Sequence, residues 1–349
     1  MTAMADFTSP NSIDLNGKGV LVTGGTGSFG KAFIRRVLEK FEPARLVIYS
    51  RDEQKQAEMA QEFSPLDHKC LRYFIGDVRD AERLQRAMQG IDIVVHAAAM
   101  KHVPIAEYNP FETIKTNVIG AENVVNVSID CGVERVVALS TDKAANPVNL
   151  YGATKLCSDK LFVAGNNLAG QAKTKFGVVR YGNVLGSRGS IIPLFRGMVR
   201  RKVDALPITD ERMSRFWITI EQGVDFVLMC LGEMQGGEIF VPKIPSMTIP
   251  ALVDALAPGY PTKIVGLRPG EKLHETMITV DDVPNTLEFE NCYVIKPTNV
   301  PKFETLKPTI RNKAGTSVEE GFQYRSDLND WWLDAEGLHA LLATAEPAE

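Results

Sequence analysis

Short apolar runs alternate along the chain with longer segments in which apolar residues recur every three or four positions. The apolar runs are rich in β-branched residues and predict strands at Gly19–Thr23, Arg45–Ser50, Leu71–Ile75, Asp92–His96, Arg135–Ser140 and Phe176–Arg180. The periodic segments predict helices at Lys31–Glu39, Glu53–Phe63, Ala81–Met88, Phe111–Cys131 and Gly152–Gly165. Strands that are apolar throughout and alternate with helices are typical of a parallel sheet covered on both faces. We therefore predict an α/β fold, a doubly wound parallel sheet of the Rossmann type.

The regular alternation of strand and helix patterns ends at about residue 180. Beyond it, proline and glycine become frequent, and helical and extended patterns mix. A chain of 349 residues is long enough for two domains. We predict a loose leader over residues 1–17, a dinucleotide-binding domain over 18–180, and a smaller mixed substrate domain over 181–349. Some segments of that last part are expected to return to the first sheet.

Composition narrows the functional classes. The 44% apolar and 23% charged residues fit a globular protein, and the net charge of −4 argues against binding to nucleic acid or to a membrane surface. The sequence shows neither an apolar stretch of membrane-spanning length nor the pattern of a secretory signal. Five widely spaced cysteines without a CxxC pair favour reduced thiols over disulfides or a zinc site. These features predict a cytoplasmic protein without a metal centre.

A glycine-rich segment follows the first predicted strand and opens the first predicted helix. Its glycines, Gly24, Gly27 and Gly30, have the GxxGxxG spacing. In a dinucleotide site such glycines allow a tight turn, close approach of a pyrophosphate, and close helix–strand packing, while the helix N-terminus attracts the anion. An ordinary structural turn is the alternative, but the strand–loop–helix context favours a dinucleotide.

The end of the second predicted strand bears on which dinucleotide binds. NAD-binding proteins usually carry an acidic residue there, whereas this chain has Ser50, followed by Arg51, Asp52 and Lys55. Cationic side chains suit a 2′-phosphate, so the sequence favours NADP, although Arg51 and Lys55 as solvated charges, with NAD, remain the alternative. Asp77, after the third strand, is interpreted as an acceptor for the adenine amine or as a helix cap.

Candidate chemistry follows the fifth predicted strand. Thr141, Asp142 and Lys143 come directly after it, and Tyr151 and Lys155 lie four residues apart on one face of the next helix. A lysine ammonium lowers the pKa of a nearby phenol, which would let Tyr151 act as a base. The alternative for Asp142 and Lys143 is an exposed ion pair in a surface turn, which would contribute little.

Long segments of the chain carry a family resemblance. They include TGGTGSFGKAF, VIYSRDEQKQAEM, HAAAMKHVPIAEYNPFETIKTNVIGAENV, LSTDKAANPVNLYGATKLCSDKLF, RYGNVLGSRGSIIPLF and GLRPGEKLHE, and they run from residue 18 to about residue 275. The chain resembles the extended short-chain dehydrogenases/reductases, and within them the NADP-dependent UDP-N-acetylglucosamine 4,6-dehydratases. The greatest similarity is to the configuration-inverting branch, which begins pseudaminic acid biosynthesis. Other sugar-nucleotide dehydratases carry Asp–Glu where this chain has Asp142–Lys143.

The resemblance implies a set of binding residues. Cofactor contacts are expected from Gly24, Thr26, Gly27, Ser28, Phe29, Gly30, Ser50, Arg51, Asp52, Lys55, Asp77, Val78, Ala97, Ala99, Lys101, Asn117, Tyr151 and Lys155. Substrate contacts are expected from Lys101, Asn183, Arg215, Arg268 and Glu271, and from the loop at 186–193. For these substrate residues, packing or turn roles are the alternative. The family also implies a homo-oligomer.

The resemblance further implies a mechanism in which NADP is reduced and then regenerated. Tyr151 takes the C4 hydroxyl proton, Thr141 orients the sugar or Tyr151, Lys143 removes the C5 proton, and Asp142 protonates the departing C6 oxygen. Lys143 must then be neutral and Asp142 protonated, which requires shifted pKa values. Three alternatives remain open: a retaining dehydratase, a UDP-sugar 4-epimerase, and a non-catalytic NADP sensor.

Overall fold

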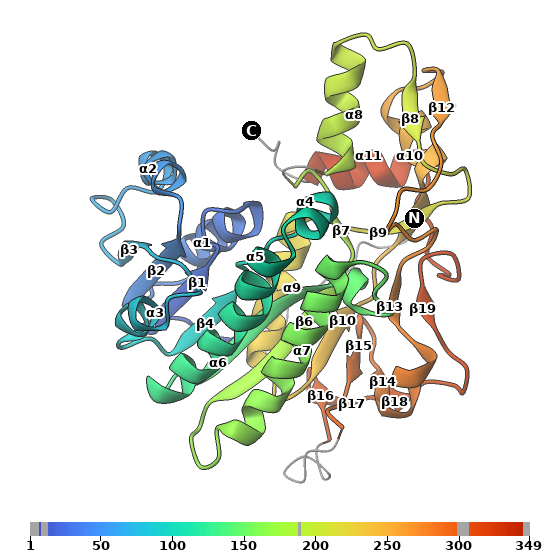
Figure 1. The fold of residues 1–349 in the computed structure, drawn as a ribbon. Coiled ribbons are helices and arrows are strands. Elements are labelled where there is room, and N and C mark those ends of the chain that lie inside the picture. Colours follow the sequence, from blue (N-terminus) through green and yellow to red (C-terminus); the bar gives the residue numbers. More distant parts are fainter. Residues whose placement is uncertain (1–6, 8–12, 188–189, 299–306, 345–349) are drawn as a thin grey trace.

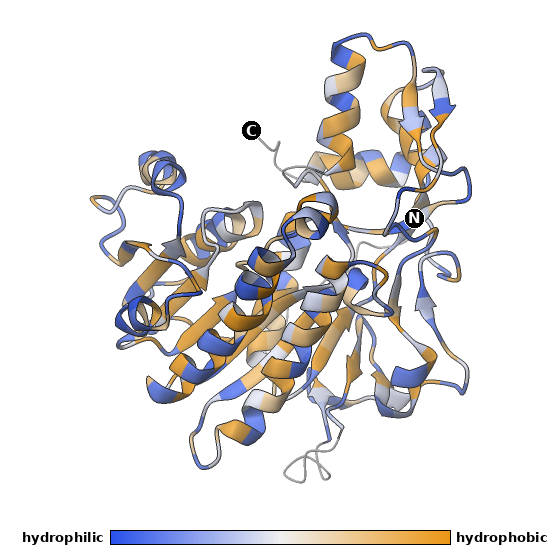
Figure 2. Ribbon diagram, viewed as in Figure 1, coloured by the Kyte–Doolittle hydropathy of each residue, from blue (hydrophilic) through white to orange (hydrophobic). Residues whose placement is uncertain are grey.

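A single ten-stranded sheet forms the centre of the protein in the computed structural model, which describes residue 7 and residues 13–187, 190–298 and 307–344 (Figure 1). The first seven strands in its order are mutually parallel, and the last three pair antiparallel. From one edge to the other they are β3 (Leu71–Ile75), β2 (Arg45–Ser50), β1 (Gly19–Thr23), β4 (Ile93–His96), β5 (Arg135–Thr141), β6 (Lys175–Tyr181), β10 (Ile239–Pro242), β15 (Cys292–Ile295), β14 (Thr286–Glu288) and β18 (Thr316–Ser317). The central strands are buried and apolar, as the colouring in Figure 2 shows.

Helices cover both faces of this sheet. They are α1 (Ser28–Lys40), α2 (Glu53–Glu62), α3 (Ala81–Met88), α6 (Gly120–Asp130), α7 (Leu150–Leu168) and α9 (Ile220–Glu233). Helices α6 and α7 lie in front of the sheet in Figure 1, with α3 packed against α6, whereas α9 lies behind the sheet and packs on α1. The prediction of a doubly wound parallel sheet is confirmed.

One predicted helix is divided. The segment expected to be a single helix over residues 111–131 contains α5 (Pro110–Ile114), a π-helical turn (Lys115–Ile119) and α6. The inward side chain of Asn117 explains this turn. Its amide holds both the backbone N–H and the carbonyl of Met100, at 2.8 and 2.9 Å, which fixes the loop after β4.

The chain beyond residue 180 contributes to two hydrophobic cores. Helix α9 and strands β10, β14 and β15 join the main core, while residues such as Trp217, Met247, Leu252 and Leu338 form a second one. The remaining elements are α4 (Val103–Tyr108), a 3-10 turn at Asp142–Ala144, β7 (Asn183–Val184), α8 (Ile191–Arg200), β8 (Leu206–Ile208), β9 (Ser214–Ile218), β11 (Ser246–Thr248), α10 (Ile249–Leu256), β12 (Thr262–Ile264), β13 (Thr276–Ile278), a 3-10 turn at Val280–Asn285, β16 (Thr309–Ile310), β17 (Lys313–Ala314), β19 (Tyr324–Arg325) and α11 (Ala335–Thr344).

Part of the segment expected to be a loose leader is packed. Phe7 and Leu15 are buried in the main core, and the Phe7 ring lies 4.9 Å from that of Phe226 on α9. Residues 1–6 and 8–12 lie outside the described part of the chain. Within the described residues, every helix is too short or too polar to cross a bilayer.

Candidate active site

A cavity of about 1000 Å³ lies at the carboxyl ends of the parallel strands, between the sheet and the second core. Ligands of doubly wound sheets bind at this edge. Of the predicted site residues, those that line it are Gly24, Thr26, Gly27, Ser28, Phe29, Gly30, Ser50, Arg51, Asp52, Lys55, Asp77, Val78, Ala97, Ala99, Lys101, Thr141, Lys143, Tyr151, Lys155, Asn183, Arg215, Arg268 and Glu271. Asp142 and Asn117 do not line it. Of the loop at 186–193, Ser187, Ser190 and Ile191 do, whereas residues 188–189 lie outside the described chain.

The glycine loop after β1 has the shape that a dinucleotide requires. Gly24 has a φ of +65°, and a Cβ there would lie 2.9 Å from the backbone of Ala98. A Cβ at Gly30 would lie 2.3 Å from the carbonyl oxygen of Gly25, so only glycine lets α1 pack this closely. The N-cap of α1 is Gly27, which has no side chain to cover the first turn. The loop therefore fits a pyrophosphate at a helix N-terminus.

The end of β2 carries a hydroxyl where an NAD site would carry an acid. The Oγ atoms of Ser50 and Thr26 lie 2.8 Å apart. Arg51 and Lys55 both line the cavity here, and each has a carboxylate neighbour, Asp77 at 3.4 Å and Asp52 at 3.1 Å. The site thus presents two partly exposed cations beside a serine.

Asp77 does not cap a helix, so that alternative from the sequence is wrong. Helix α3 begins at Ala81, as expected, and its N-cap is Asp80, whose carboxylate accepts from the N–H of Arg83. The Asp77 carboxylate instead accepts from the backbone and guanidinium of Arg79. Burial favours its neutral form, but the Arg79 hydrogen bonds outweigh burial and hold the pKa of Asp77 below its usual value.

Tyr151 and Lys155 lie in the first turns of α7, which Asn149 caps by accepting from the N–H of Gly152 at 2.8 Å. Burial raises the pKa of Tyr151 to about 12, although Lys143 and the hydrogen bond with Thr141 act to lower it. Burial also lowers the pKa of Lys155, against the charge of Asp159. Lys143 is a nearby ammonium whose charge acts to lower the pKa of Tyr151.

The Asp142–Lys143 pair is not a surface turn. Asp142 is fully buried behind the cavity wall, and its Oδ1 accepts from Thr141 Oγ1 at 2.9 Å and from Lys143 Nζ at 3.0 Å. Burial raises the pKa of Asp142 even against the charge of Lys143, which suits a proton donor. Burial acts to lower the pKa of Lys143, but the charges of Asp142 and Glu275 outweigh burial and hold this pKa above its usual value. The resting structure therefore holds Lys143 as an ammonium.

Sequence reasoning missed two charged residues beside this pair. Glu275 is buried, lines the cavity, and lies 3.1 Å from Lys143 Nζ. Lys272, three residues before Glu275, also lines the cavity, and its Nζ donates to the carbonyl of Ala145 at 2.6 Å. Both belong to the GLRPGEKLHE segment, and the available signal was a carboxylate placed directly before the apolar strand β13.

The predicted substrate residues differ in how many hydrogen bonds their side chains already make within the protein. The Arg215 guanidinium donates to the carbonyls of Ser214, Lys272 and Leu273 at 2.7–3.1 Å, so the packing role left open in the sequence is realised. Arg268 is largely exposed and paired with Glu271 on the loop facing α7. That loop is fastened by Asn149 Nδ2, which donates to the carbonyl of Gly270 at 2.8 Å.

Asn117 acts as a support for the site. Besides holding Met100, its amide donates to Thr154 Oγ1 at 3.0 Å, which ties the π-helical turn to α7. Because this side chain is buried away from the cavity, its place in the structure is behind the loop at 97–101, and a direct cofactor contact is not supported.

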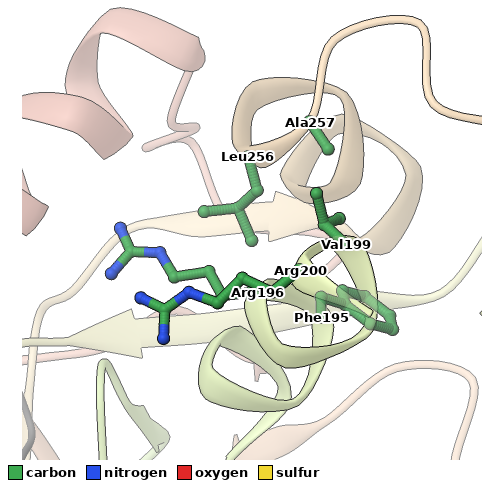
Figure 3. Close-up of a pocket in the computed structure, with 6 residues that line it drawn as sticks. All are labelled: Phe195, Arg196, Val199, Arg200, Leu256 and Ala257. Atoms are coloured by element: carbon green, nitrogen blue, oxygen red, sulfur yellow. The ribbon is translucent and has the colours of Figure 1, made fainter. Parts of the chain in front are cut away.

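A second, smaller hollow of about 190 Å³ lies between α8 and the end of α10 (Figure 3). Its six lining residues include Arg196 and Arg200, whose guanidinium groups extend to the same side. It contains no carboxylate, hydroxyl or thiol and so offers no acid–base chemistry. Among the described residues, no three histidine, cysteine or acidic side chains are grouped as metal ligands.

Comparison with known proteins agrees with this geometry. The chain is 56% identical over 333 residues, 95% of its length and 99% of the relative's, to a Campylobacter jejuni UDP-N-acetylglucosamine 4,6-dehydratase (inverting). It is 40% identical over 285 residues, 80% of its length and 82% of the relative's, to a Rickettsia felis UDP-glucose 4-epimerase.

A solved structure shows the same fold with a cofactor in place. The dTDP-glucose 4,6-dehydratase DesIV from Streptomyces venezuelae, solved as a double mutant with NAD and DAU bound, matches with a TM-score of 0.65 and 25% identity. The match covers 73% of this chain and 86% of that one. The family model described as "Polysaccharide biosynthesis protein" matches residues 20–297. The chain therefore belongs to the polysaccharide biosynthesis protein family.

Proposed function

We propose that the protein dehydrates UDP-N-acetylglucosamine to a UDP-linked 2-acetamido-2,6-dideoxy-hex-4-ulose with inversion at C5. The observation that carries this proposal is the Asp142–Lys143 pair, whose carboxyl group is buried and whose amine reaches the cavity. It adjoins Thr141 and Tyr151 at the edge of a cavity that also holds a dinucleotide loop. An enzyme that only oxidises and reduces C4 has no use for an additional acid and amine beside the phenol. Elimination of water requires both.

The chemistry divides among the side chains in the cavity. Tyr151 takes the C4 hydroxyl proton, and the C5 proton becomes acidic once C4 is a ketone. Lys143 removes that C5 proton, and Asp142, whose pKa is raised by burial, gives its proton to the C6 oxygen that leaves as water. Asp142 lies behind the wall, so the C6 oxygen must approach it past Lys143 and Thr141. Reprotonation of C5 from the opposite face inverts this carbon.

NADP is the cofactor that these residues fit. Gly24, Gly27 and Gly30 would hold the pyrophosphate, and Arg51 with Lys55 would face the 2′-phosphate beside Ser50. Bound there, NADP would supply a hydride acceptor for C4 and, once reduced, a hydride donor for C6. The other proposed cofactor residues line the same cavity, except Asn117.

The substrate's UDP group is proposed to lie along the part of the cavity built from residues after 181. Arg268 is largely exposed and would exchange its pairing with Glu271 for the diphosphate, whereas Arg215 contributes by fixing residues 272–273. Lys101, Asn183 and Glu271 line the same space. We further propose a cytoplasmic homo-oligomer whose product enters pseudaminic acid biosynthesis.

A 4-epimerase is the second candidate, because the chain is 40% identical to a protein named UDP-glucose 4-epimerase. An epimerase needs the Tyr151–Lys155 element and has no step for Asp142 or Lys143. A retaining dehydratase would use the same side chains and differ only in the face from which C5 receives its proton.

Incubation of the holoenzyme with UDP-N-acetylglucosamine in heavy water, followed by proton NMR, separates these candidates. The proposed reaction gives a 6-deoxy-4-ulose with deuterium at C5 and inverted C5 configuration. Deuterium at C5 with the original configuration identifies the retaining reaction. UDP-N-acetylgalactosamine without loss of water identifies the epimerase and contradicts the proposal.

A further inference from the structure

The strongest unexplained feature of the cavity is the second carboxylate at Lys143. Lys143 Nζ lies between Asp142 Oδ1 at 3.0 Å and Glu275 Oε1 at 3.1 Å. The mechanism above assigns a task to Asp142 and none to Glu275. Yet Glu275 lines the cavity, and Asp142 does not. Glu275 is also only 2% exposed, and a buried carboxylate in this position is costly unless it is neutralised.

The surroundings of Glu275 supply that neutralisation. Three cations face it: Lys143, Arg215 with Nε 3.7 Å away, and Lys272 with Nζ 4.0 Å away. Burial acts to raise the pKa of Glu275, but these cations outweigh burial and hold it below its usual value. Lys143 Nζ faces Glu275 Oε1, so a proton can pass directly between these two atoms, while Glu275 Oε2 has no hydrogen-bond partner within the described protein.

The backbone around Glu275 is fixed from several sides. Its N–H donates to Ser326 Oγ at 3.0 Å, and Arg215 donates to the carbonyls of Lys272 and Leu273, three and two residues earlier in the chain. Lys272 in turn donates to the carbonyl of Ala145, next to the turn that carries Lys143. The protein thus uses a segment far along the chain to present one carboxylate to one amine.

We infer that Glu275 is the proton partner of Lys143: it stabilises the Lys143 ammonium between turnovers and accepts a proton from it when the amine is needed at C5. This inference rests on the proposed dehydration. It makes Glu275 a positioning residue that acts through Lys143. It also addresses a conflict in the site, because the Lys143 ammonium cannot serve as a base until it has given up a proton. Since the pKa of Lys143 is raised and that of Glu275 is lowered in the resting site, this transfer is uphill, and the free amine forms only transiently, when the C5 proton is taken.

The proton balance of this step closes. A Lys143 N–H bond breaks, its electron pair stays on nitrogen, and the proton forms an O–H bond with Glu275. The free amine then takes the C5 proton and is again an ammonium. Glu275 then gives its proton to solvent, and C5 takes a proton from solvent on the face opposite Lys143, which restores both groups. Protonation from that opposite face inverts C5.

The test compares Glu275→Gln with Glu275→Asp in the holoenzyme. Glutamine keeps the size of the side chain but cannot accept the proton, while aspartate can accept it from a slightly longer distance. Two steps are followed with UDP-N-acetylglucosamine: the absorbance of the reduced cofactor in a single turnover, and deuterium uptake at C5 over a range of pH. Glu238→Gln is the matched control, because Glu238 is equally buried, lies outside the cavity lining and, within the described part of the chain, accepts from the N–H groups of Gln235 and Gly236.

We expect Glu275→Gln to reduce the cofactor at nearly the parental rate and to lose about 100-fold in deuterium uptake at neutral pH. Deuterium uptake by Glu275→Gln should recover as pH rises, because the Lys143 ammonium can then lose its proton to solvent without the help of Glu275. Glu275→Asp should keep the parental pH profile, and Glu238→Gln the parental rates.

Two results would overturn this inference and leave the proposed function intact. Glu275→Gln with the parental rate and pH profile shows that the carboxylate takes no proton. Equal losses of cofactor reduction and deuterium uptake, with no change in pH profile, show that Glu275 only supports the fold. If the parent fails to dehydrate UDP-N-acetylglucosamine, the proposed function falls and takes this inference with it.

Discussion

At the scale of single residues, the cavity separates the steps of the proposed reaction between Tyr151 and Lys143. Lys143→Ala should still reduce the cofactor with substrate, because the phenol and Thr141 remain, although more slowly because the charge that acts to lower the pKa of Tyr151 is gone. Dehydration should fall by about 100-fold or more. Tyr151→Phe should lose both steps. Rapid mixing with UDP-N-acetylglucosamine, read by absorbance of the reduced cofactor and by product NMR, measures the two steps separately. Unchanged dehydration in Lys143→Ala would remove this division of labour.

The same scale shows what a sequence can reveal of a site. Residues adjacent in the chain, such as Thr141, Asp142 and Lys143, were identified because one strand end presents them together. Glu275 was missed because its contact with Lys143 spans more than a hundred residues and depends on where Arg215 fixes the chain. The pKa directions were also out of reach, since they depend on burial and on charges that meet only in three dimensions.

At the scale of elements, Asn149 connects the helix of Tyr151 to the loop of Arg268. Its Oδ1 caps α7 through the N–H of Gly152, and its Nδ2 donates to the carbonyl of Gly270. Asn149→Asp keeps the cap but loses the donor, so we expect a higher KM for the UDP-sugar with kcat changed by less than about threefold and little change in Tm. Asn149→Ala loses both contacts and should also destabilise the fold by about 1 kcal/mol.

Steady-state kinetics and thermal unfolding of these two variants distinguish the roles. Equal KM values in Asn149→Asp and the parent would show that the loop does not depend on this hydrogen bond. The contact lies beyond sequence prediction, as does the π-helical turn at Lys115–Ile119. Periodicity locates an apolar face over residues 111–131, but the turn arises because Asn117 must reach the backbone of Met100. The regular strands, by contrast, were predicted to within a residue or two because burial on both faces leaves a continuous apolar run.

At the scale of the whole molecule, a buried histidine should make stability depend on pH. His96 lies in the core of the sheet with its Nδ1 2.8 Å from Thr23 Oγ1, and burial lowers its pKa from 6.5 to about 3. The unfolded chain therefore binds a proton below pH 6.5 that the folded chain refuses until about pH 3. The free energy of unfolding should fall by up to about 1.4 kcal/mol per pH unit in this window. Urea unfolding of the parent and of His96→Gln should show a shallower pH dependence in the variant. Equal slopes in both would assign the acid sensitivity to other groups.

The whole molecule also carries an exposed apolar surface on α4, α5 and the turns beside them. It includes Tyr108, 87% exposed, and Phe111, 75% exposed, with Ile105, Ile114 and Val148 nearby in the chain or fold. Large apolar side chains gathered on adjacent helices mark association surfaces, and the proposed homo-oligomer is the occupant we expect. Light scattering should give a mass that is a multiple of 38.4 kDa for the parent, and a smaller one for Tyr108→Glu with Phe111→Glu. Leu66→Glu is the matched control, because Leu66 is equally exposed but lies on the loop after α2. A parent that stays monomeric at high concentration, or a double variant with the parental mass, would exclude this face as the contact between subunits.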